Sequence, residues 1–252
     1  MNHKSKKLAL TAAVALAMAT LGTGMAQAAD AAPEAKPDNE ISFNAAITSD
    51  YRYRAISQTR LKPALQGGAD WVNNPTGFYA GAWGSTIKWI KDGGGDASVE
   101  VDLYGGKRGE IGPGVSYDVG FLAYMYPSND LNPSANTREV YGQVGYGPAT
   151  LKYSHSLSNL FGFADSKHST YLDASYNQDV GDGYVLNLHV GHQKVKNSSQ
   201  FSYTDWKAGV TKDLGFASLA LAYIDTNTEN YLAPNGKKLG KAGLVLTLSK
   251  TF

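Results

Sequence analysis

Residues 41–54 read ISFNAAITSDYRYR, and this stretch decides the fold because apolar and polar side chains alternate along it. One set of alternate positions holds Ile41, Phe43, Ala45, Ile47, Tyr51 and Tyr53. The other set holds Ser42, Asn44, Thr48, Asp50, Arg52 and Arg54. Since successive side chains of a β-strand point to opposite faces, the pattern predicts a strand with one apolar face and one polar face.

The same alternation recurs along the rest of the chain. It is clear in VEVDLY at 99–104, VSYDVGF at 115–121, LDASYN at 172–177 and DWKAGVT at 205–211. In all, the sequence predicts twelve strands, starting near residues 41, 62, 78, 98, 115, 139, 149, 169, 183, 203, 216 and 241. The strands near 78 and 216 alternate poorly, so the pattern does not assign their faces.

The predicted connections alternate between short and long. The short ones, rich in the Gly, Pro, Asn and Asp of tight turns, are 73–77, 109–114, 147–148, 181–183 and 213–215. The long ones are 55–61, 91–97, 127–138, 159–168, 194–202 and 226–240. Six long and five short connections are what an up-and-down transmembrane barrel of twelve strands has, with both termini on the inner side.

Beyond residue 28 no apolar run approaches the roughly 18 residues of a membrane-spanning helix. A membrane protein without such helices has to be a closed β-barrel, because only closure satisfies every backbone N–H and C=O group in lipid. We therefore expect an all-β, antiparallel transmembrane barrel over residues 41–252. Composition alone also allows a soluble all-β domain, but a β-sandwich gives no reason for connection lengths to alternate.

The two ends of the chain fit export to an outer membrane. Lys4, Lys6 and Lys7 precede an apolar segment at 8–21 and a small-x-small site at 26–28. This order predicts a cleaved signal peptide over 1–28, with a retained membrane anchor as the alternative. Residues 29–40, rich in Ala, Pro and acidic side chains, form a predicted flexible leader.

The chain ends on an alternating strand with a terminal aromatic residue, which is typical of bacterial outer-membrane barrels. Leu244, Leu246, Leu248 and Phe252 share a face that Lys250 interrupts. Other aromatic residues near strand ends are expected at the two headgroup boundaries; they are Tyr53, Tyr117, Tyr146, Tyr184 and Tyr223. The alternative is the ordinary preference of Tyr for strands.

Composition excludes several classes of function. Removing the three signal-peptide lysines from 23 basic residues leaves 20 against 22 acidic ones, so the mature chain carries about −2 and lacks the basic footprint of a nucleic-acid partner. The absence of cysteine excludes disulfides, thiolate metal sites and cysteine nucleophiles. We expect no cofactor.

Several strings together resemble the TorF-type porin family over essentially the whole mature chain. They are SDYRYR (49–54), ISQT (56–59), PALQGG (63–68), GFYAG (77–81), WGS (83–85), VEVDLYGG (99–106), SYDVG (116–120) and YMYP (124–127). Ala55 stands where the family pattern leads us to expect Gly. The resemblance implies an outer-membrane barrel that conducts small solutes, and it supplies neither a substrate nor catalytic residues.

The polar strand faces predict the lining of the lumen. The candidate pore-lining residues are Asp50, Arg52, Arg54, Asp70, Glu100, Asp102, Asp118, Asp173, Asp205 and Lys207, with Lys152 on the same face of its strand. Both charge signs are present, so the lining either tunes ion selectivity in a water-filled path or pairs across the interior and plugs it. Arg52 and Arg54 beside Asp50 are the candidate selectivity cluster, with a structural salt-bridge network as the alternative.

Other chemistry has less support in the sequence. No mature His-x-Ser is present, and His189 and His192 are three apart, so on a strand they face opposite sides and make a poor metal pair. We expect no enzyme, no catalytic residue and no metal site; a closed structural barrel, a surface-interaction protein and a lipid-hydrolysing enzyme are the alternatives. The expected partners are outer-membrane lipids, lipopolysaccharide, the barrel assembly machinery and small solutes, and we expect a monomer.

Overall fold

Twelve strands of the described chain form one closed antiparallel barrel. The computed structural model describes residues 37–252. The strands are β1 (Asn39–Thr48), β4 (Ala64–Asn73), β5 (Phe78–Thr86), β6 (Val99–Gly112), β7 (Val115–Met125), β8 (Thr137–Tyr146), β9 (Ala149–Ser156), β10 (Thr170–Gly181), β11 (Tyr184–Lys194), β12 (Tyr203–Asp213), β13 (Ser218–Thr226) and β14 (Gly243–Thr251). The predicted fold class and strand number are confirmed, and each strand begins within two residues of its expected start.

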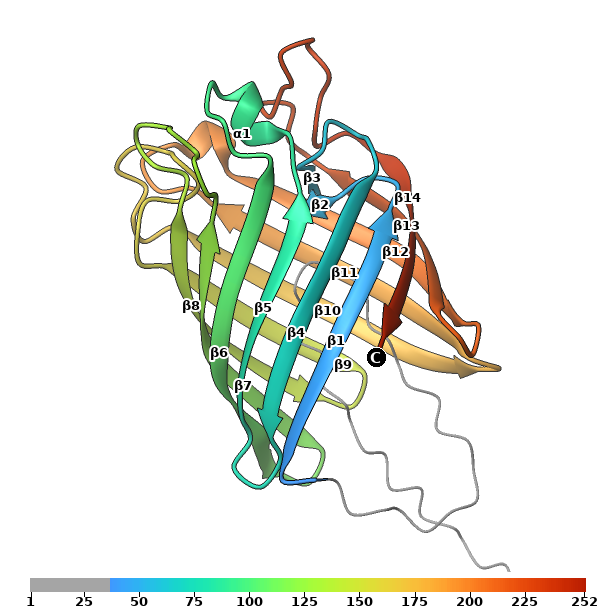
Figure 1. The fold of residues 1–252 in the computed structure, drawn as a ribbon. Helices are drawn as coiled ribbons and strands as arrows, with labels where there is room; N and C mark the ends of the chain where they lie inside the picture. The colour runs from blue at the N-terminus through green and yellow to red at the C-terminus, as the bar shows by residue number, and fades with distance from the viewer. Residues whose placement is uncertain (1–36) are drawn as a thin grey trace, which may run out of the picture.

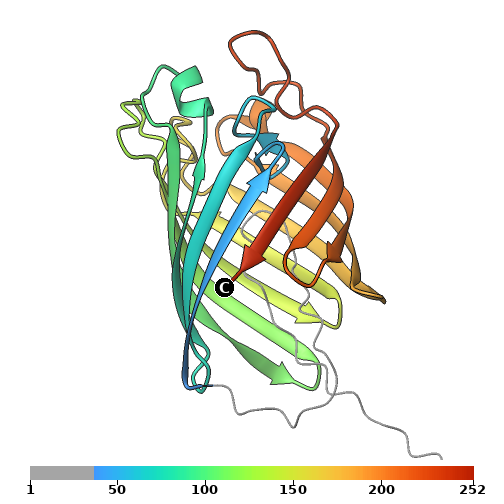
Figure 2. The ribbon, with the colours of Figure 1, turned by 45° about the vertical axis from the view of Figure 1, so that its right-hand side comes forward.

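Each barrel strand pairs with its neighbours in chain order, and β14 closes the barrel by pairing with β1. Figure 2 shows the red β14 alongside the blue β1. The closing ladder runs from Asn44 opposite Thr251 to Thr48 opposite Thr247. The backbone hydrogen bonds between Phe43 and Phe252, at 3.1 and 2.8 Å, extend it by one step. Closure leaves no long edge strand for another chain to pair with.

The alternating sequence pattern translates into an outer apolar surface and a polar lumen. On β1, Ile41, Phe43 and Ile47 are exposed on the outside, at 66%, 56% and 50% of their surface. On β6, Val99 and Leu103 are exposed, whereas Glu100 and Asp102 are buried in the interior. An exposed band of large aliphatic and aromatic side chains is expected where lipid, rather than water, surrounds the protein.

The connections are long at one end of the barrel and short at the other, as the sequence predicts (Figure 1). The long connections at the upper end in Figure 1 include the short helix α1 (Trp89–Asp92) and the 3₁₀ helix η1 (Ser199–Phe201). Turns such as Asp182–Gly183 close the lower end, with positive φ angles of 53° and 71°. Within residues 37–252, no helix is long and apolar enough to cross a membrane.

The first connection differs from the prediction. The alternating stretch 41–54 is not one strand, because β1 ends at Thr48 and residues 49–63 turn into the barrel. There they form a hairpin of β2 (Arg52–Tyr53) and β3 (Ile56–Ser57). Tyr51 is 3% exposed and packs in the interior, so neither Tyr51 nor Tyr53 shares the outer face with Ile47. The placement of Tyr53 in an outer aromatic girdle is therefore wrong.

The structure also assigns the two strands whose faces the sequence left open. On β5, Tyr79 and Ser85 are buried inside while Phe78 is exposed outside. On β13, Ala220 and Ile224 are inside. Tyr146, Tyr184, Tyr223 and Phe252 are exposed on the outer surface. The predicted signal peptide and most of the predicted leader lie outside the described residues, and β1 begins at Asn39, two residues before the expected barrel start.

Candidate functional site

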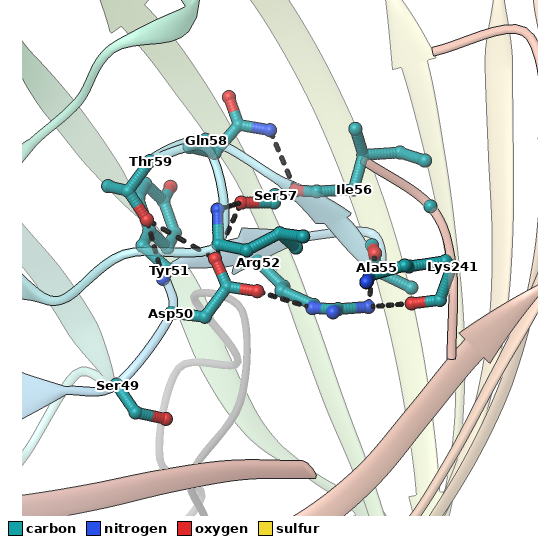
Figure 3. Close-up of polar contacts among 12 residues, drawn as sticks. Ser49, Asp50, Tyr51, Arg52, Ala55, Ile56, Ser57, Gln58, Thr59 and Lys241 are labelled. Carbon is teal, nitrogen blue, oxygen red and sulfur yellow. Dashed lines mark hydrogen bonds and ion pairs between the residues drawn. The ribbon is translucent and has the colours of Figure 1, made fainter. Parts of the chain in front are cut away.

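The connection 49–63 contains a hairpin of residues 50–59, called here the lumen hairpin, which lies inside the barrel near its long-loop end (Figures 1 and 3). Its two-residue turn is Arg54-Ala55, with φ angles of 44° and 64°. Such turns normally contain Gly or Asn because L-residues with a side chain disfavour positive φ. Two non-glycine residues in this conformation indicate that contacts with the surrounding barrel hold the turn in place.

Asp50 organises the base of the lumen hairpin (Figure 3). Its Oδ2 accepts a hydrogen bond from Arg52 Nε at 2.7 Å, and its Oδ1 accepts bonds from Ser57 Oγ at 2.5 Å and Thr59 Oγ1 at 3.2 Å. The Thr59 hydroxyl also accepts the Tyr51 N–H at 3.2 Å. One buried carboxylate thus joins both arms of the hairpin, and charge-assisted hydrogen bonds of this kind are among the stronger ones in proteins.

Arg52 also ties the hairpin to the last long loop. Its Nη1 donates to the carbonyl oxygen of Lys241 at 2.7 Å, in the connection between β13 and β14 (Figure 3). Arg52 and Asp50 are both buried. The pair is therefore held rigidly by its own ion pair and by the last long loop. That Arg52 and Arg54 set ion selectivity stays a prediction.

Arg54 fastens the tip of the hairpin to the barrel wall. Its guanidinium donates to both carboxylate oxygens of Glu139 on β8, at 2.7 and 3.1 Å, and to Gln193 Oε1 on β11 at 2.7 Å. The guanidinium also lies over the ring of Tyr171, 4.3 Å from its centre. Burial is the largest single influence and lowers the pKa of Arg54, but the Glu139 carboxylate, Tyr53 and Tyr124 together outweigh it. The pKa of Arg54 therefore lies well above its ordinary value, and the tip carries a fixed positive charge.

Tyrosine hydroxyls complete the attachment. Tyr53 and Tyr124 share a hydrogen bond of 2.5 Å between their hydroxyl oxygens, and Tyr51 donates to Glu100 Oε1 at 3.1 Å. Burial raises the pKa of Tyr51 well above its ordinary value, and Glu100 raises it further. Burial is also the largest cause of the raised pKa of Tyr53. Both side chains are therefore neutral hydrogen-bond donors while the hairpin occupies the lumen.

A second polar cluster lines the wall formed by β10, β11 and β12. His189 Nε2 lies 2.8 Å from Asp205 Oδ1, and His189 Nδ1 lies 3.3 Å from Asp173 Oδ2. Tyr171 Oη donates to Asp205 at 3.0 Å. The two carboxylates hold the imidazole from both sides, which makes this cluster a rigid, charged section of wall.

Ser175, His189 and Asp205 superficially form a catalytic triad. Ser175 Oγ lies 3.2 Å from His189 Nδ1, but it donates its proton to Asp173 Oδ1 at 2.8 Å. The amides of β10 and β11 around Ser175 are used in the strand ladder, so they are not available to stabilise an oxyanion. The arrangement fits an ion-pair network better than a nucleophile with its base.

Acidic side chains gather on the inner face of β4, β6 and β7. Glu100 Oε2 and Asp102 Oδ1 are buried without a hydrogen-bond partner among the described residues. Asp70 accepts a hydrogen bond from Tyr104, and Asp118 accepts one from Tyr79. Within residues 37–252, no group of three or more His, Cys, Asp or Glu is arranged to hold a metal ion.

A narrow cavity remains between the lumen hairpin and the barrel wall. Of the candidate pore-lining residues, it is lined by Arg52, Arg54, Asp102, Asp173, Asp205 and Lys207. Its volume is about 80 Å³. Since one water needs roughly 10–15 Å³ of such volume, the cavity holds a few water molecules, and the lumen is constricted at this level.

The other candidate residues also lie inside the barrel but away from this cavity. Asp50 is on the hairpin, Asp70 on β4, Glu100 on β6 and Asp118 on β7. Whether any of the ten lines a conducting path stays a prediction.

Three residues that hold the hairpin tip are not among the predicted site residues, namely Glu139, Gln193 and Tyr171. The alternation of Arg138, Glu139 and Val140 is a signal that places Glu139 inside.

Comparison with known proteins identifies the family. The family described as "Bacterial protein of unknown function (Gcw_chp)" matches residues 32–252. The chain belongs to this family. That description does not carry the TorF name, and no curated protein matches the sequence.

The chain also resembles solved structures of outer-membrane proteins. The KdgM porin aligns with a TM-score of 0.54 at 7% identity, over 84% of this chain and 97% of that one. OccAB3 of Acinetobacter baumannii aligns with a TM-score of 0.44 at 12% identity, over 86% and 65%. LpxR from Salmonella typhimurium aligns with a TM-score of 0.39 at 11% identity, over 84% and 99%. The KdgM likeness shows a porin-type barrel fold.

Proposed function

We propose that this Gcw_chp protein is an outer-membrane channel for the passive diffusion of ions or small polar solutes, narrowed by its lumen hairpin. The observation that carries the proposal is a closed twelve-stranded barrel with an apolar outside, a polar inside and an inward-folded first loop. The interior of a barrel of about eight strands is filled by its own side chains, whereas a barrel of about 16 strands encloses a wide channel. A barrel of twelve strands therefore fits a narrow channel.

The same surface supports a location in the outer membrane. An exposed apolar band on a closed barrel needs lipid around it, and the resemblance to TorF-type porins and to the KdgM fold supports the outer membrane. In that membrane the long connections face outward and the short turns face the periplasm. The lumen hairpin then lies near the outer mouth, where it meets an entering solute first.

Planar-bilayer recording tests the proposal directly. Refolded mature protein is expected to give discrete conductance steps that are small compared with those of a wide general porin. A variant in which residues 50–59 are replaced by a Gly-Ser linker of equal length is expected to give larger steps, since the hairpin would no longer occupy the lumen.

Heat modifiability on denaturing gels shows that each preparation is a folded barrel. A folded wild-type barrel that stays electrically silent, together with a silent linker variant, would contradict the channel. Such silence would favour the closed structural barrel, and lipid hydrolysis by the same preparation would favour the enzyme.

A further inference from the structure

A pocket opens at the long-loop end of the barrel, outside the lumen. Three connections that are far apart in the sequence form it. They are the last residues of the connection 49–63, both ends of the connection between β5 and β6, and the connection between β13 and β14; the ribbon in Figure 1 shows where these connections lie. Its volume is about 400 Å³, and it is lined by Thr59, Arg60, Lys62, Pro63, Thr86, Ile87, Lys88, Ser98, Val99, Asn235 and Lys237.

The charge of this pocket is one-sided. Four of its lining residues are basic and none is acidic. Arg60 is paired with Asp92, whereas no carboxylate of residues 37–252 forms an ion pair with Lys62, Lys88 or Lys237. Three ammonium groups around one concave surface create a positive potential that favours an anionic ligand.

The remaining wall combines hydroxyl groups with apolar side chains. Thr59, Thr86 and Ser98 provide hydroxyls, and Asn235 provides an amide. Pro63, Ile87 and Val99 provide apolar surface. A small inorganic anion would not contact the apolar part of this wall favourably, whereas an amphipathic ligand would bind both the polar and the apolar part.

The outer surface beneath the pocket continues the apolar wall. Val99 lies opposite Thr86, and the Leu65 N–H donates to Thr86 Oγ1 at 3.2 Å, so these residues form one row at the pocket's rim. Farther down, the outward positions of β4 and β5 are held by small residues, Gly67, Ala69, Ala80, Ala82 and Gly84. Exposed Leu103 and Trp71 border this column. It is a shallow strip of lipid-facing surface that leaves room for an acyl chain.

We propose that this pocket binds the phosphate groups of an outer-leaflet lipid, a phosphorylated glycolipid of the lipid A kind, with an acyl chain along the small-residue strip. The inference rests on the outer-membrane location and orientation of the proposed function, but not on conduction. Lys62, Lys88 and Lys237 contact the phosphates, and the exposed hydroxyl group of Ser98 donates a hydrogen bond to a phosphate or sugar oxygen.

The test measures binding of bisphosphorylated lipid A to the full mature protein in detergent, by native mass spectrometry. The triple variant K62Q/K88Q/K237Q is expected to bind on the order of tenfold more weakly, because each exposed charge pair contributes a fewfold at most. The matched control K91Q/K238Q/K241Q removes three exposed lysines from the same outer loops but outside the pocket, and it should bind like the wild type. Equal affinities of the pocket variant and the wild type would overturn the proposal.

Two further arms separate the lipid from a free anion. Ala82→Phe fills the small-residue strip and should weaken binding of lipid A, whereas Ala208→Phe, on the outer face of β12, should not. Inorganic phosphate should bind far more weakly than lipid A; equally tight binding would overturn the lipid assignment. Bilayer recordings on the same preparations keep the two proposals apart, since a silent barrel that binds lipid A contradicts only the channel.

Discussion

Arg54 is a single residue on which the position of the lumen hairpin and the charge of the lumen both depend. Truncating one partner of a buried ion pair typically costs about 3–5 kcal/mol because the other charge stays unpaired. We expect Arg54→Gln to loosen the hairpin and leave Glu139 as an uncompensated negative charge beside the path. Conductance should rise and selectivity should shift towards cations, measured as the reversal potential in a KCl gradient.

Arg138→Gln is the matched control for this prediction, because Arg138 is the exposed neighbour of Glu139 and points out of the barrel. It should leave the reversal potential unchanged. An Arg54→Gln channel with wild-type selectivity would reject the assignment of Arg54 to the conducting path.

The same residue shows what the sequence could and could not predict at this scale. Alternation places Asp50, Arg52 and Arg54 inside the barrel, and they are inside. It places them on the first strand, however, whereas they belong to the hairpin. The turn at Arg54-Ala55 contains no Gly or Asn, so it carries no local signal, and tertiary contacts with Glu139 and Gln193 impose its positive φ angles.

At the scale of the hairpin, docking depends on two neutral tyrosines. Burial raises the pKa of Tyr51 and of Tyr53 well above the ordinary value of about 10. Because the pKa is higher in the docked state, the contribution of these two tyrosines to the stability of the docked hairpin is fully present below pH about 10. It is lost as the pH rises further, because the undocked tyrosines ionise first. The increase in channel conductance that follows from undocking of the hairpin should therefore begin above pH about 10.

A double variant Tyr51→Phe/Tyr53→Phe provides the comparison, since it retains the rings but cannot ionise. Its conductance should be less sensitive to alkaline pH than that of the wild type. A wild-type conductance that does not change up to pH 11 would contradict the docking role of these hydroxyls.

The sequence predicts which face of a strand points outward where the outward and inward side chains differ in polarity. It does not assign the faces where the two sets of side chains are similar in polarity. On β6, the sequence Val-Glu-Val-Asp alternates and both faces follow from it. On β5, the outward positions Ala80, Ala82 and Gly84 are small, and the inward ones include the aromatic Tyr79 and Trp83. Hydrophobicity then does not separate the faces, and only the pairing with β4 and β6 decides them.

At the scale of the whole molecule, both the lumen and the lipid-facing surface depend on closure of the barrel. The ladder between β1 and β14 that closes it is short. Five residue pairs join β1 to β14, whereas ten pairs join β1 to β4. Alternating connection lengths predicted that the barrel closes, but the extent of the closing ladder depends on where Phe252 ends opposite Phe43, a long-range register that no local pattern contains.

The short closing ladder makes barrel assembly sensitive to one backbone bond. The Ser49 N–H donates to the Leu246 carbonyl at 2.8 Å, and Phe252 exchanges hydrogen bonds with Phe43, so even-numbered residues of β14 bond towards β1. Leu248→Pro removes the N–H that faces Ile47, and in lipid an unsatisfied backbone group costs several kcal/mol. We expect this variant to lose the heat-modifiable band on denaturing gels and its protection from protease.

Leu248→Ala, which keeps the N–H and loses only outward apolar surface, should still form the folded barrel. A Leu248→Pro variant that is fully heat-modifiable would contradict this prediction, because the barrel would then stay closed without this hydrogen bond of the β1–β14 ladder.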